Sequence, residues 1–386
     1  MKYFIIAGEA SGDLHASGVC RQLRRADKNA LIVGFGGDKM KKEGCDIKLH
    51  ISKMAFMGVV AVLKNLKQIK QNFALARKTI LEEKPDALIL IDYPSFNLKI
   101  AKFVHKNLPQ TKIYYYIPPK VWAWKKWRVH KIAEYSHRIL TIFPFETDFY
   151  SQYGYEVTYV GNPTAEAIND FQKKHNTTGH QDDYIVLMPG SRKHEIQACL
   201  PVMLRAALHF SQQYKIKITA APAINDSIYT NILADINIGD AVEVVRDKNY
   251  QLLSGAKAAI VNSGTATLET ALLNCPQVAV YHLALPHLVA LIRPLLFTIP
   301  YFTLVNIIGG KQIIRELLAY EFTEDNVRAE LEKLLNDSTC RKQMQSDYAT
   351  LHTILGNNAA SKEVADIILH DFTRPANHSE LPSQQS

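Results

Sequence analysis

Short apolar runs alternate with stretches of helical spacing along most of the chain. In the first half, these runs are rich in β-branched and aromatic residues, as buried strands are, and each is followed by a helical pattern. They lie at 2–8, 30–36, 86–91, 112–117, 138–143 and 157–160. Such alternation favours right-handed βαβ units, which build a parallel sheet with helices on both faces. The first half is therefore predicted to form a doubly wound α/β domain.

The pattern restarts after a polar interval at 172–183, so we expect a second domain of the same class. Its strand-like runs lie at 184–188, 215–220, 241–245, 258–261 and 277–281. A chain of 386 residues also exceeds what one hydrophobic core usually supports. We predict two Rossmann-like domains, 1–165 and 166–344, facing a cleft at the carboxyl ends of their strands.

The last part of the chain has helical spacing, and its end is polar. Residues 345–372 are predicted to form helices that cross back onto the first domain or onto a partner subunit, and the sequence leaves both alternatives open. Residues 373–386 have the composition of a disordered tail.

The charge balance favours an anionic partner. The chain has 45 Lys and Arg against 37 Asp and Glu, a net charge of +8, which suits a nucleotide, a nucleic acid or a lipid surface. Its five cysteines are scattered, without the spacing of zinc ligands, which predicts a reducing compartment and no metal site. The apolar stretch 283–308 is broken by prolines and an arginine, which argues against a membrane-spanning helix.

The turn at 189–192, Pro-Gly-Ser-Arg, joins a strand-like run to a helical segment at 194–214. The first N–H groups of a helix lack internal partners and carry the positive end of its dipole, so they favour an anion. The guanidinium of Arg192 fits phosphate oxygens. We therefore consider Gly190, Ser191, Arg192 and Glu195 as phosphate-binding residues. The alternative is an ordinary turn with an exposed arginine.

A second turn of the same kind follows the run at 258–261. Hydroxyl and N–H groups at such a turn bind a diphosphate without a metal. With the first turn, it places two anion-binding loops on one predicted sheet. The candidate residues of the second turn are Ser263, Gly264, Thr265, Ala266 and Glu269.

The glycine-containing turn at 7–15 leads from the first strand into a helix. It differs from the G-x-G-x-x-G fingerprint of dinucleotide-binding proteins, which argues against a dehydrogenase. The alternatives are a ligand-contacting loop and a tight βα turn, and His15 could be a base or an exposed side chain. The candidate loop residues are Gly8, Glu9, Ser11, Gly12 and Asp13.

Asp92 follows the run at 86–91, at the carboxyl end of a predicted strand. A carboxylate in that place is costly unless it is hydrogen-bonded or used in chemistry. Asp92 is therefore the first candidate for a general base. The alternative is a helix N-cap, although Ser95 or Asn97 could serve that purpose instead.

Two segments could contact lipid. In the loop at 118–128, Trp122 and Trp124 stand among cations, a pattern that suits single-stranded nucleic acid, the acyl–headgroup boundary or a rigid loop with solvated lysines. The apolar stretch at 54–63 is followed by lysines, which suits a lipid interface or a core helix. Its candidate membrane residues are Met54, Phe56, Met57, Val59, Val60 and Leu63.

Together these motifs resemble those of the bacterial lipid-A-disaccharide synthases, a family of glycosyltransferases of the two-domain GT-B type. The matching stretches follow the order of the family from position 7 to about 310. They are 7–13, 57–60, 91–96, 121–124, 143–146, 189–192 with Glu195, 263–269, and Asn306.

The resemblance implies an inverting transfer of 2,3-diacylglucosamine from its UDP derivative to 2,3-diacylglucosamine 1-phosphate, with no cofactor and no metal ion. It implies that Asp92 is the base, that Arg192 lies near the diphosphate, and that Asn306 and the turn at 263–269 bind the UDP donor. It also implies a cytoplasmic protein, peripheral on the anionic inner face of the inner membrane, without a nucleic-acid partner. Whether the protein is a homodimer is left open.

The chain departs from the family pattern in two places. Pro118, Pro119 and Lys120 stand where a Ser-Pro-Ser or Ala-Pro-Ser sequence is more usual, and Ala319 stands where glutamine is expected. Two other functions stay open at this point. One is a UDP-sugar 2-epimerase of the same fold, and the other is a non-catalytic protein that binds nucleic acid through the tryptophan loop.

Overall fold

The computed structural model describes residues 1–54, 65–123, 126–175, 183–222, 224–236, 241–282 and 300–373. The chain folds into two compact units. The first unit comprises Met1–Pro163 with Asn358–Ser386, and the second is Thr164–Asn357. The division thus falls between Pro163 and Thr164, whereas the sequence placed it after residue 165. The helices predicted together at 345–372 are also divided between the two units.

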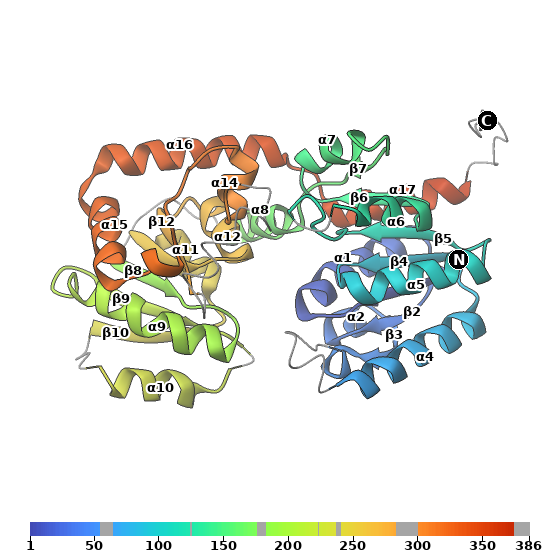
Figure 1. The fold of residues 1–386 in the computed structure, drawn as a ribbon, viewed down its shortest axis with the longest axis horizontal. Helices are drawn as coiled ribbons and strands as arrows, with labels where there is room; N and C mark the ends of the chain where they lie inside the picture. The colour runs from blue at the N-terminus through green and yellow to red at the C-terminus, as the bar shows by residue number, and fades with distance from the viewer. Residues whose placement is uncertain are drawn as a thin grey trace. The chain divides into compact units, whose positions relative to one another are not determined.

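The first unit is built on a parallel sheet of seven strands in the order β3-β2-β1-β4-β5-β6-β7 (Figure 1). The strands are β1 (Lys2–Ala7), β2 (Leu31–Gly36), β3 (Asp46–His50), β4 (Ala87–Ile91), β5 (Lys112–Tyr116), β6 (Arg138–Thr141) and β7 (Thr158–Tyr159). The predicted doubly wound α/β architecture is confirmed. The edge strand β3 was not predicted.

Helices cover both faces of this sheet, because successive strand residues point to opposite sides. Tyr3 and Ile5 pack with α1 and α17, whereas Phe4 and Ile6 pack with α4, α5 and α6. The helices of the unit are α1 (Ala10–Ala26), α2 (Asp38–Lys42), α4 (Leu66–Glu83), α5 (Pro94–Asn107), α6 (Arg128–Tyr135), α7 (Phe145–Ser151) and α17 (Ala360–Thr373).

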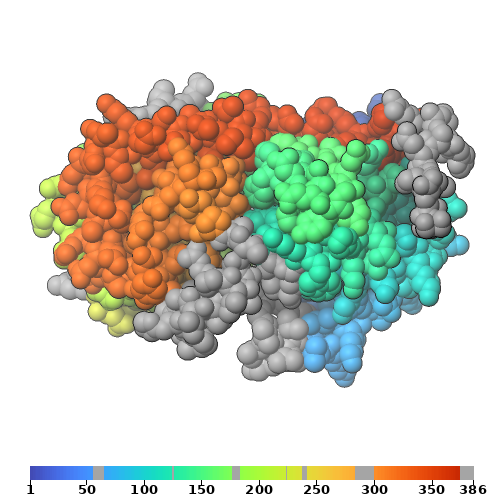
Figure 2. Space-filling view, turned by 45° about the horizontal axis from the view of Figure 1, so that its top comes forward, coloured from blue at the N-terminus to red at the C-terminus, as the bar shows by residue number. Residues whose placement is uncertain are grey.

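The last helix, α17, belongs to the first unit and packs against α1. The carboxylate of Asp371 accepts hydrogen bonds from Arg138 Nε at 3.0 Å and Nη2 at 2.8 Å, and from the Tyr114 hydroxyl at 3.2 Å. Lys112 Nζ donates to the Asp371 carbonyl. Figure 2 shows the red residues of α17 against the green and teal residues of the same unit. Polar contacts therefore fasten α17 to β5 and β6.

The second unit repeats the plan with six parallel strands in the order β10-β9-β8-β11-β12-β13. They are β8 (Tyr184–Met188), β9 (Lys215–Ala220), β10 (Val242–Arg246), β11 (Ala258–Asn262), β12 (Gln277–Tyr281) and β13 (Glu316–Leu318). Its helices are α8 (Pro163–His175), α9 (Lys193–Leu208), α10 (Asp226–Ala234), α11 (Asn249–Gly255), α12 (Thr265–Leu272), α14 (Leu304–Gly309), α15 (Glu324–Asn336) and α16 (Ser338–Leu355). Only the short β13 was missing from the predicted strands.

Each sheet has a switch point at its centre, where the strand order reverses. In the first unit, β1 pairs with both β2 and β4, and in the second, β8 pairs with both β9 and β11. Connections leave such a point toward opposite faces of the sheet, so the carboxyl ends of the two central strands border a crevice that commonly holds a ligand. The predicted site residues follow these central strands.

Across the described ranges, no helix combines the length and the apolar character that crossing a membrane requires.

Candidate functional site

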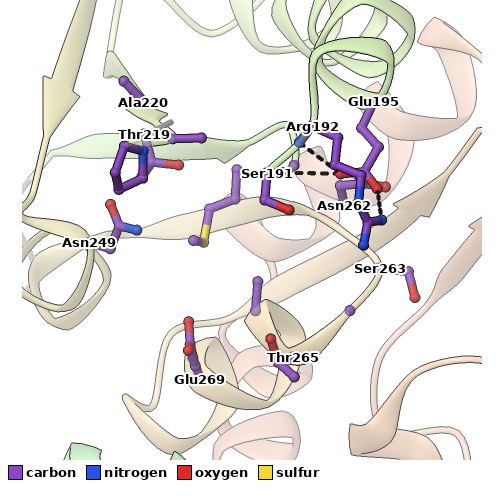
Figure 3. Close-up of a pocket in the computed structure, with 16 residues that line it drawn as sticks. Ser191, Arg192, Glu195, Thr219, Ala220, Asn249, Asn262, Ser263, Thr265 and Glu269 are labelled. Atoms are coloured by element: carbon purple, nitrogen blue, oxygen red, sulfur yellow. Dashed lines mark hydrogen bonds and ion pairs between the residues drawn. The ribbon is translucent and has the colours of Figure 1, made fainter. Parts of the chain in front are cut away.

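A cavity of about 380 Å³ lies at the switch point of the second sheet. Its walls come from the ends of β8, β9 and β11 and from the starts of α9, α11 and α12 (Figure 3). The volume is within the range of roughly 300–1,000 Å³ that is usual for small-molecule sites. Nine predicted residues line it: Gly190, Ser191, Arg192, Glu195, Ser263, Gly264, Thr265, Ala266 and Glu269.

Gly190 is required by the shape of the first turn. Its φ of 122° is in a region that disfavours side chains. A Cβ atom there would also lie 2.7 Å from Oε2 of Glu195 and 2.8 Å from Nδ2 of Asn262. The bare backbone at this position lets the turn close against the neighbouring strand end.

Glu195 holds the first turn in place from within α9. Its Oε2 accepts the backbone N–H groups of Ser191 at 3.0 Å and Arg192 at 3.2 Å, and its Oε1 accepts Arg192 Nη1 at 2.6 Å. Because Glu195 is the third residue of α9, this is the N-terminal capping interaction expected of a glutamate in that position. The carboxylate therefore orients the guanidinium of Arg192 at the cavity wall (Figure 3).

The second turn places the start of α12 at the cavity. Ser263 N–H donates to the Val280 carbonyl at 2.8 Å, which fixes the turn to β12, and the Thr267 hydroxyl donates to the Gly264 carbonyl at 2.8 Å. A Cβ at Gly264 would meet no atom within 4 Å, so the space in front of the turn is open. Two helices thus begin at one cavity, and both present the positive end of a helix dipole there.

Two asparagines and a glutamate bring acceptor groups to the cavity, Asn262 beside the first turn and Asn249 on the opposite side. The Oδ1 atoms of Asn249 and Asn262 are buried and have no hydrogen-bond partner among the described residues. Burial raises the pKa of Glu269, against the effect of a 3.5 Å hydrogen bond from Tyr250. Unpaired buried acceptors are costly, so they fit a ligand that donates hydrogen bonds, as a nucleobase does. Figure 3 shows Asn249 across the cavity from Arg192.

Part of the cavity lining was not predicted from the sequence. Thr219, Asn249 and Asn262 line the cavity but were not among the candidates. Asn262 directly precedes the Ser-Gly-Thr turn and could have been included with it. Thr219 and Asn249 carry no local signal, because only the pairing of β9 with β8 and β10 brings them to the cavity.

Asn306, which is predicted to lie near the donor, is on α14. Its amide group is fully buried. Its Nδ2 donates to the Ile314 carbonyl and to Glu316 Oε1, each at 2.9 Å, and its Oδ1 accepts the N–H groups of Ile313 at 2.8 Å and Ile314 at 3.0 Å. These bonds occupy the amide, and Asn306 is not among the cavity-lining residues. These contacts join α14 to the segment that leads into β13.

The described residues contain no group of three or more His, Cys, Asp or Glu side chains placed to hold a metal ion. All five cysteines are free thiols. Within the described part of the cavity, the groups available to an anion are backbone N–H groups, hydroxyls, the side-chain amides of Asn249 and Asn262, and Arg192.

In the first unit, Asp92 follows β4 directly at the switch point of the sheet. Asp92 and Tyr93 both have positive φ, 46° and 49°, an unfavourable conformation for residues with side chains. Asn97 stabilises this turn, since its Nδ2 donates to the carbonyls of Ile91 at 3.2 Å and Asp92 at 2.8 Å. Tyr93, not Asp92, is the N-cap residue of α5, so the capping alternative for Asp92 is wrong.

The environment of Asp92 suits a base. Burial raises the pKa of its carboxyl, while the positive charge of Lys120 and a hydrogen bond from the Tyr93 N–H act to lower it. A carboxylate with a raised pKa is a stronger base than an exposed one. The half-buried carboxyl therefore has the properties expected of a proton acceptor.

The glycine-containing turn after β1 has a packing explanation. A Cβ at Gly8 would lie 2.3 Å from Cγ of Tyr93, and a Cβ at Gly12 would lie 3.3 Å from Cβ of Ala7. Gly8 therefore makes room for the Tyr93 ring, whose hydroxyl donates to the Met54 carbonyl at 2.7 Å. The turn supports the conformation of the Asp92–Tyr93 segment.

Asp13 serves the structure of the first unit. It is buried, and its carboxylate accepts the N–H groups of Gly37 at 2.7 Å, Lys39 at 3.0 Å and Met40 at 3.1 Å. It therefore caps the start of α2 from α1. Glu9 precedes α1 as its N-cap residue, and Ser11 is exposed.

His15 lies half-buried on α1. Burial lowers its pKa to about 4, so its imidazole is neutral at pH 7. A neutral imidazole can accept a proton, but a pKa this low makes it a weaker base than an ordinary histidine.

Two predicted membrane residues are instead core residues. Met54 is fully buried, and Trp122 is 6% exposed, with Nε1 donating to Glu146 Oε1 at 3.0 Å. The cationic residues around Trp122 in the sequence favoured a lipid-facing indole. Its hydrogen-bond partner, Glu146, lies 24 residues further along the chain and holds the indole in the core. Trp127, which was not a candidate, is 57% exposed and lies beside the cations of Arg128 and Lys131. Phe56, Met57, Val59, Val60, Leu63 and Trp124 lie outside the described residues.

Comparison with known proteins identifies the family. The family model for lipid-A-disaccharide synthetase matches residues 3–369. The lipid-A-disaccharide synthase of Geobacter sulfurreducens is 32% identical over 376 residues, covering 95% of this chain and 96% of that protein. The lipid-A-disaccharide synthase of Syntrophus aciditrophicus is 34% identical over 373 residues, again covering 95% and 96%.

Among solved structures, the UDP-GlcNAc 2-epimerase of Neisseria meningitidis bound to UDP-GlcNAc matches with a TM-score of 0.65. The match covers 96% of this chain and 100% of the epimerase, at 10% identity. A likeness at this identity shows a shared GT-B fold and not a shared reaction. The family match favours a lipid A glycosyltransferase over the epimerase and nucleic-acid alternatives: the chain belongs to the lipid-A-disaccharide synthase family, the glycosyltransferases of lipid A biosynthesis.

Proposed function

We propose that this protein transfers 2,3-diacylglucosamine from its UDP derivative to 2,3-diacylglucosamine 1-phosphate. The products are a β-1,6-linked disaccharide 1-phosphate and UDP. The observation that carries the proposal is the cavity in which the starts of α9 and α12 meet beside Arg192. That arrangement supplies fixed donors for a diphosphate without requiring a metal ion.

The proposed reaction is a single displacement with inversion. The 6-hydroxyl oxygen of the acceptor attacks the anomeric carbon of the donor and forms the new glycosidic bond. Its proton passes to the carboxylate of Asp92. The bond between the anomeric carbon and the β-phosphate oxygen breaks, and UDP leaves with the electron pair.

The second unit acts on the leaving group. Negative charge grows on the UDP oxygen as its bond breaks, and fixed donors interact more strongly with that charge than with the intact donor. Each such donor is worth on the order of 3 kcal/mol in comparable sites. Arg192 and the first N–H groups of α12 are the donors that we assign to this task.

The acyl chains of both sugars place the reaction at a bilayer surface, since each buried methylene contributes about 0.8 kcal/mol. We propose a cytoplasmic enzyme that binds the inner membrane peripherally through the apolar segment at 56–63. Helix α4 supports this proposal, because Leu66, Lys67 and Lys70 at its start are exposed. Lysines there would contact anionic headgroups.

Incubation of the purified protein with both acylated sugars tests the reaction. We expect UDP and disaccharide 1-phosphate to form together, and neither to form when the acceptor is omitted. UDP release without acceptor, or epimerised donor, would contradict the proposal. Binding of RNA at physiological salt without any disaccharide would favour a nucleic-acid function instead.

Co-sedimentation with vesicles tests the membrane contact. Vesicles that contain an anionic lipid should lose most of the bound protein when Met57, Val60 and Leu63 are changed to serine. The control is Leu31→Ser, a residue of β2 that is 61% exposed. Equal binding by the triple variant and the wild type would rule out this segment as the membrane contact.

A further inference from the structure

Two neighbouring strand ends bring Lys120 close to Asp92. Strands β4 and β5 are paired, with Ile91 opposite Tyr116, and each continues directly into a loop. The Asp92 N–H donates to the Tyr116 carbonyl at 3.3 Å, so the two loops leave the sheet side by side. One loop carries Asp92, and the other carries Lys120.

The loop that carries Lys120 is rigidly built. Pro119 and Val121 are buried on either side of the exposed lysine. The Val121 N–H donates to the Pro119 carbonyl at 2.6 Å, and the Ala123 N–H donates to the Lys120 carbonyl at 3.1 Å. Trp122 follows, anchored in the core by its hydrogen bond to Glu146. The base of the lysine side chain is therefore fixed, and only its four-carbon stem can move.

The Lys120 ammonium is available to a ligand. Among the described residues, it forms no hydrogen bond and no ion pair closer than 4 Å. Its charge nevertheless acts on two carboxyl groups, since burial raises the pKa of both Asp92 and Glu146 and the charge of Lys120 opposes that rise. An exposed cation thus lies within electrostatic range of the proposed base, without being neutralised by a salt bridge.

The acceptor has a matching pair of groups. In a glucosamine 1-phosphate, C1 and C5 both adjoin the ring oxygen, so the 1-phosphate and the 6-hydroxyl lie along the same edge of the sugar. A carboxylate that receives the 6-hydroxyl proton then has a phosphate as its neighbour on the ligand. A lysine beside that carboxylate meets the phosphate.

We propose that Lys120 binds the 1-phosphate of the acceptor and so positions the 6-hydroxyl at Asp92. This inference rests on the proposed function. It makes Lys120 a specificity-determining residue that distinguishes a phosphorylated acceptor from the same sugar without phosphate. Charge-assisted hydrogen bonds to phosphate are strong enough to make that distinction.

Steady-state kinetics of Lys120→Met, Lys120→Arg and the control Lys106→Met test the inference. Lys106 is also exposed, but it lies near the end of α5, away from the strand ends that carry Asp92. We expect Lys120→Met to raise KM for the phosphorylated acceptor by about tenfold or more, with KM for the UDP donor unchanged. Lys120→Arg should restore most of the affinity, and Lys106→Met should match the wild type.

An acceptor without the 1-phosphate provides the decisive comparison. Wild type and Lys120→Met should use it equally poorly. If Lys120→Met leaves KM for the phosphorylated acceptor within twofold, or impairs both acceptors equally, the inference is wrong.

A binding measurement separates this inference from the proposed reaction. The probe is a water-soluble glucosamine 1-phosphate with two short acyl chains, titrated into the protein and followed by ³¹P NMR. Saturable binding that Lys120→Met abolishes supports the phosphate contact even if no disaccharide is formed. Binding that the variant leaves unchanged overturns it even in a fully active enzyme.

Discussion

The carboxylate of Glu195 binds Arg192 at two places, since Oε2 accepts its backbone N–H at 3.2 Å and Oε1 accepts its Nη1 at 2.6 Å. One glutamate thus sets both the backbone of the turn and the direction of the guanidinium. The residue that orients the arginine is half-buried in α9, whereas the arginine itself is 47% exposed.

Glu195→Ala and Arg192→Ala should therefore not act independently. Each should raise KM for the UDP donor by about tenfold or more, because each removes the oriented guanidinium from the phosphate site. The double variant should raise KM for the UDP donor little more than either single variant does. A double-mutant cycle on donor KM measures this, and fully additive effects would show that Glu195 does not orient Arg192.

Gly190→Ala should lower both stability and donor affinity. The added methyl group would overlap Glu195 and Asn262 in addition to the strain of a positive φ, so we expect a loss of about 1–3 kcal/mol in the free energy of unfolding. Gly310→Ala is the matched control, since its φ is 65° and a Cβ there would meet no atom within 4 Å. Denaturant unfolding and KM for the UDP donor are measured for both variants. If Gly310→Ala lowers stability and donor affinity as much as Gly190→Ala does, the steric argument is wrong.

Asp92→Asn should reduce kcat by about 10²–10⁴-fold, as expected for the loss of a general base. Burial raises the Asp92 pKa, so in the wild type the carboxylate is present above that pKa and kcat falls as pH drops through it. The pH dependence of kcat should lose this acidic limb in Asp92→Asn. Ser95→Ala, an exposed neighbour on α5, should leave the profile unchanged.

The same measurement decides between the two candidate bases. His15→Asn should keep the acidic limb of kcat if Asp92 is the base. Loss of that limb in His15→Asn, together with full activity of Asp92→Asn, would transfer the role to His15.

Glu146→Gln should change how the stability of the first unit depends on pH. Burial raises the Glu146 pKa to about 7, against hydrogen bonds from the Phe143 N–H and from Trp122. Its ordinary pKa is lower, so the folded state binds more protons than the unfolded state between the two values. Stability from this group is therefore greatest below pH 4.5 and declines as pH rises to about 7, by roughly 3 kcal/mol.

The glutamine variant cannot ionise and should lose this decline. Melting temperatures of wild type and Glu146→Gln between pH 5 and pH 8 provide the check. Parallel curves would show that Glu146 does not titrate in this range.

Asp371→Asn should loosen the last helix. The carboxylate accepts a bidentate pair from Arg138 and a hydrogen bond from Tyr114, so we expect a loss of about 2 kcal/mol in the free energy of unfolding. Asp366→Asn on the same helix disturbs only an exposed pair with Lys362 and should change stability little. Limited proteolysis of α17 and thermal unfolding measure the difference. Equal effects of the two substitutions would show that the Asp371 contacts do not hold α17 in place.

The sequence predicted most of the fold because the central strands are buried on both faces. Such strands are continuous apolar runs, as the residues of β4 and β8 are. The strands β3 and β13 escaped notice because both lie at sheet edges. In β3, Asp46 and Lys48 are charged and exposed, and β13 has only three residues. Neither gives a run that is long enough to stand out.

Site residues were predictable where the signal lies in a few adjacent residues of the sequence. Small residues directly after a strand, as at Gly190 and Ser263, mark a turn that approaches a ligand. Asn249 and Trp122 were not predictable, because their places depend on distant partners. The hydrogen bond from Trp122 reaches a glutamate 24 residues further along the chain, and no local pattern encodes it.

The position of α17 has a consequence for biosynthesis. Val364, Ala365 and Ile368 complete the apolar cluster that α1 and β1 begin, yet a ribosome makes them only after the whole second unit. During translation, one apolar face of the first sheet therefore stays partly uncovered until α17 has been made. By then, the second unit has its complete sequence. The unit that emerges first from the ribosome is therefore the last to be finished.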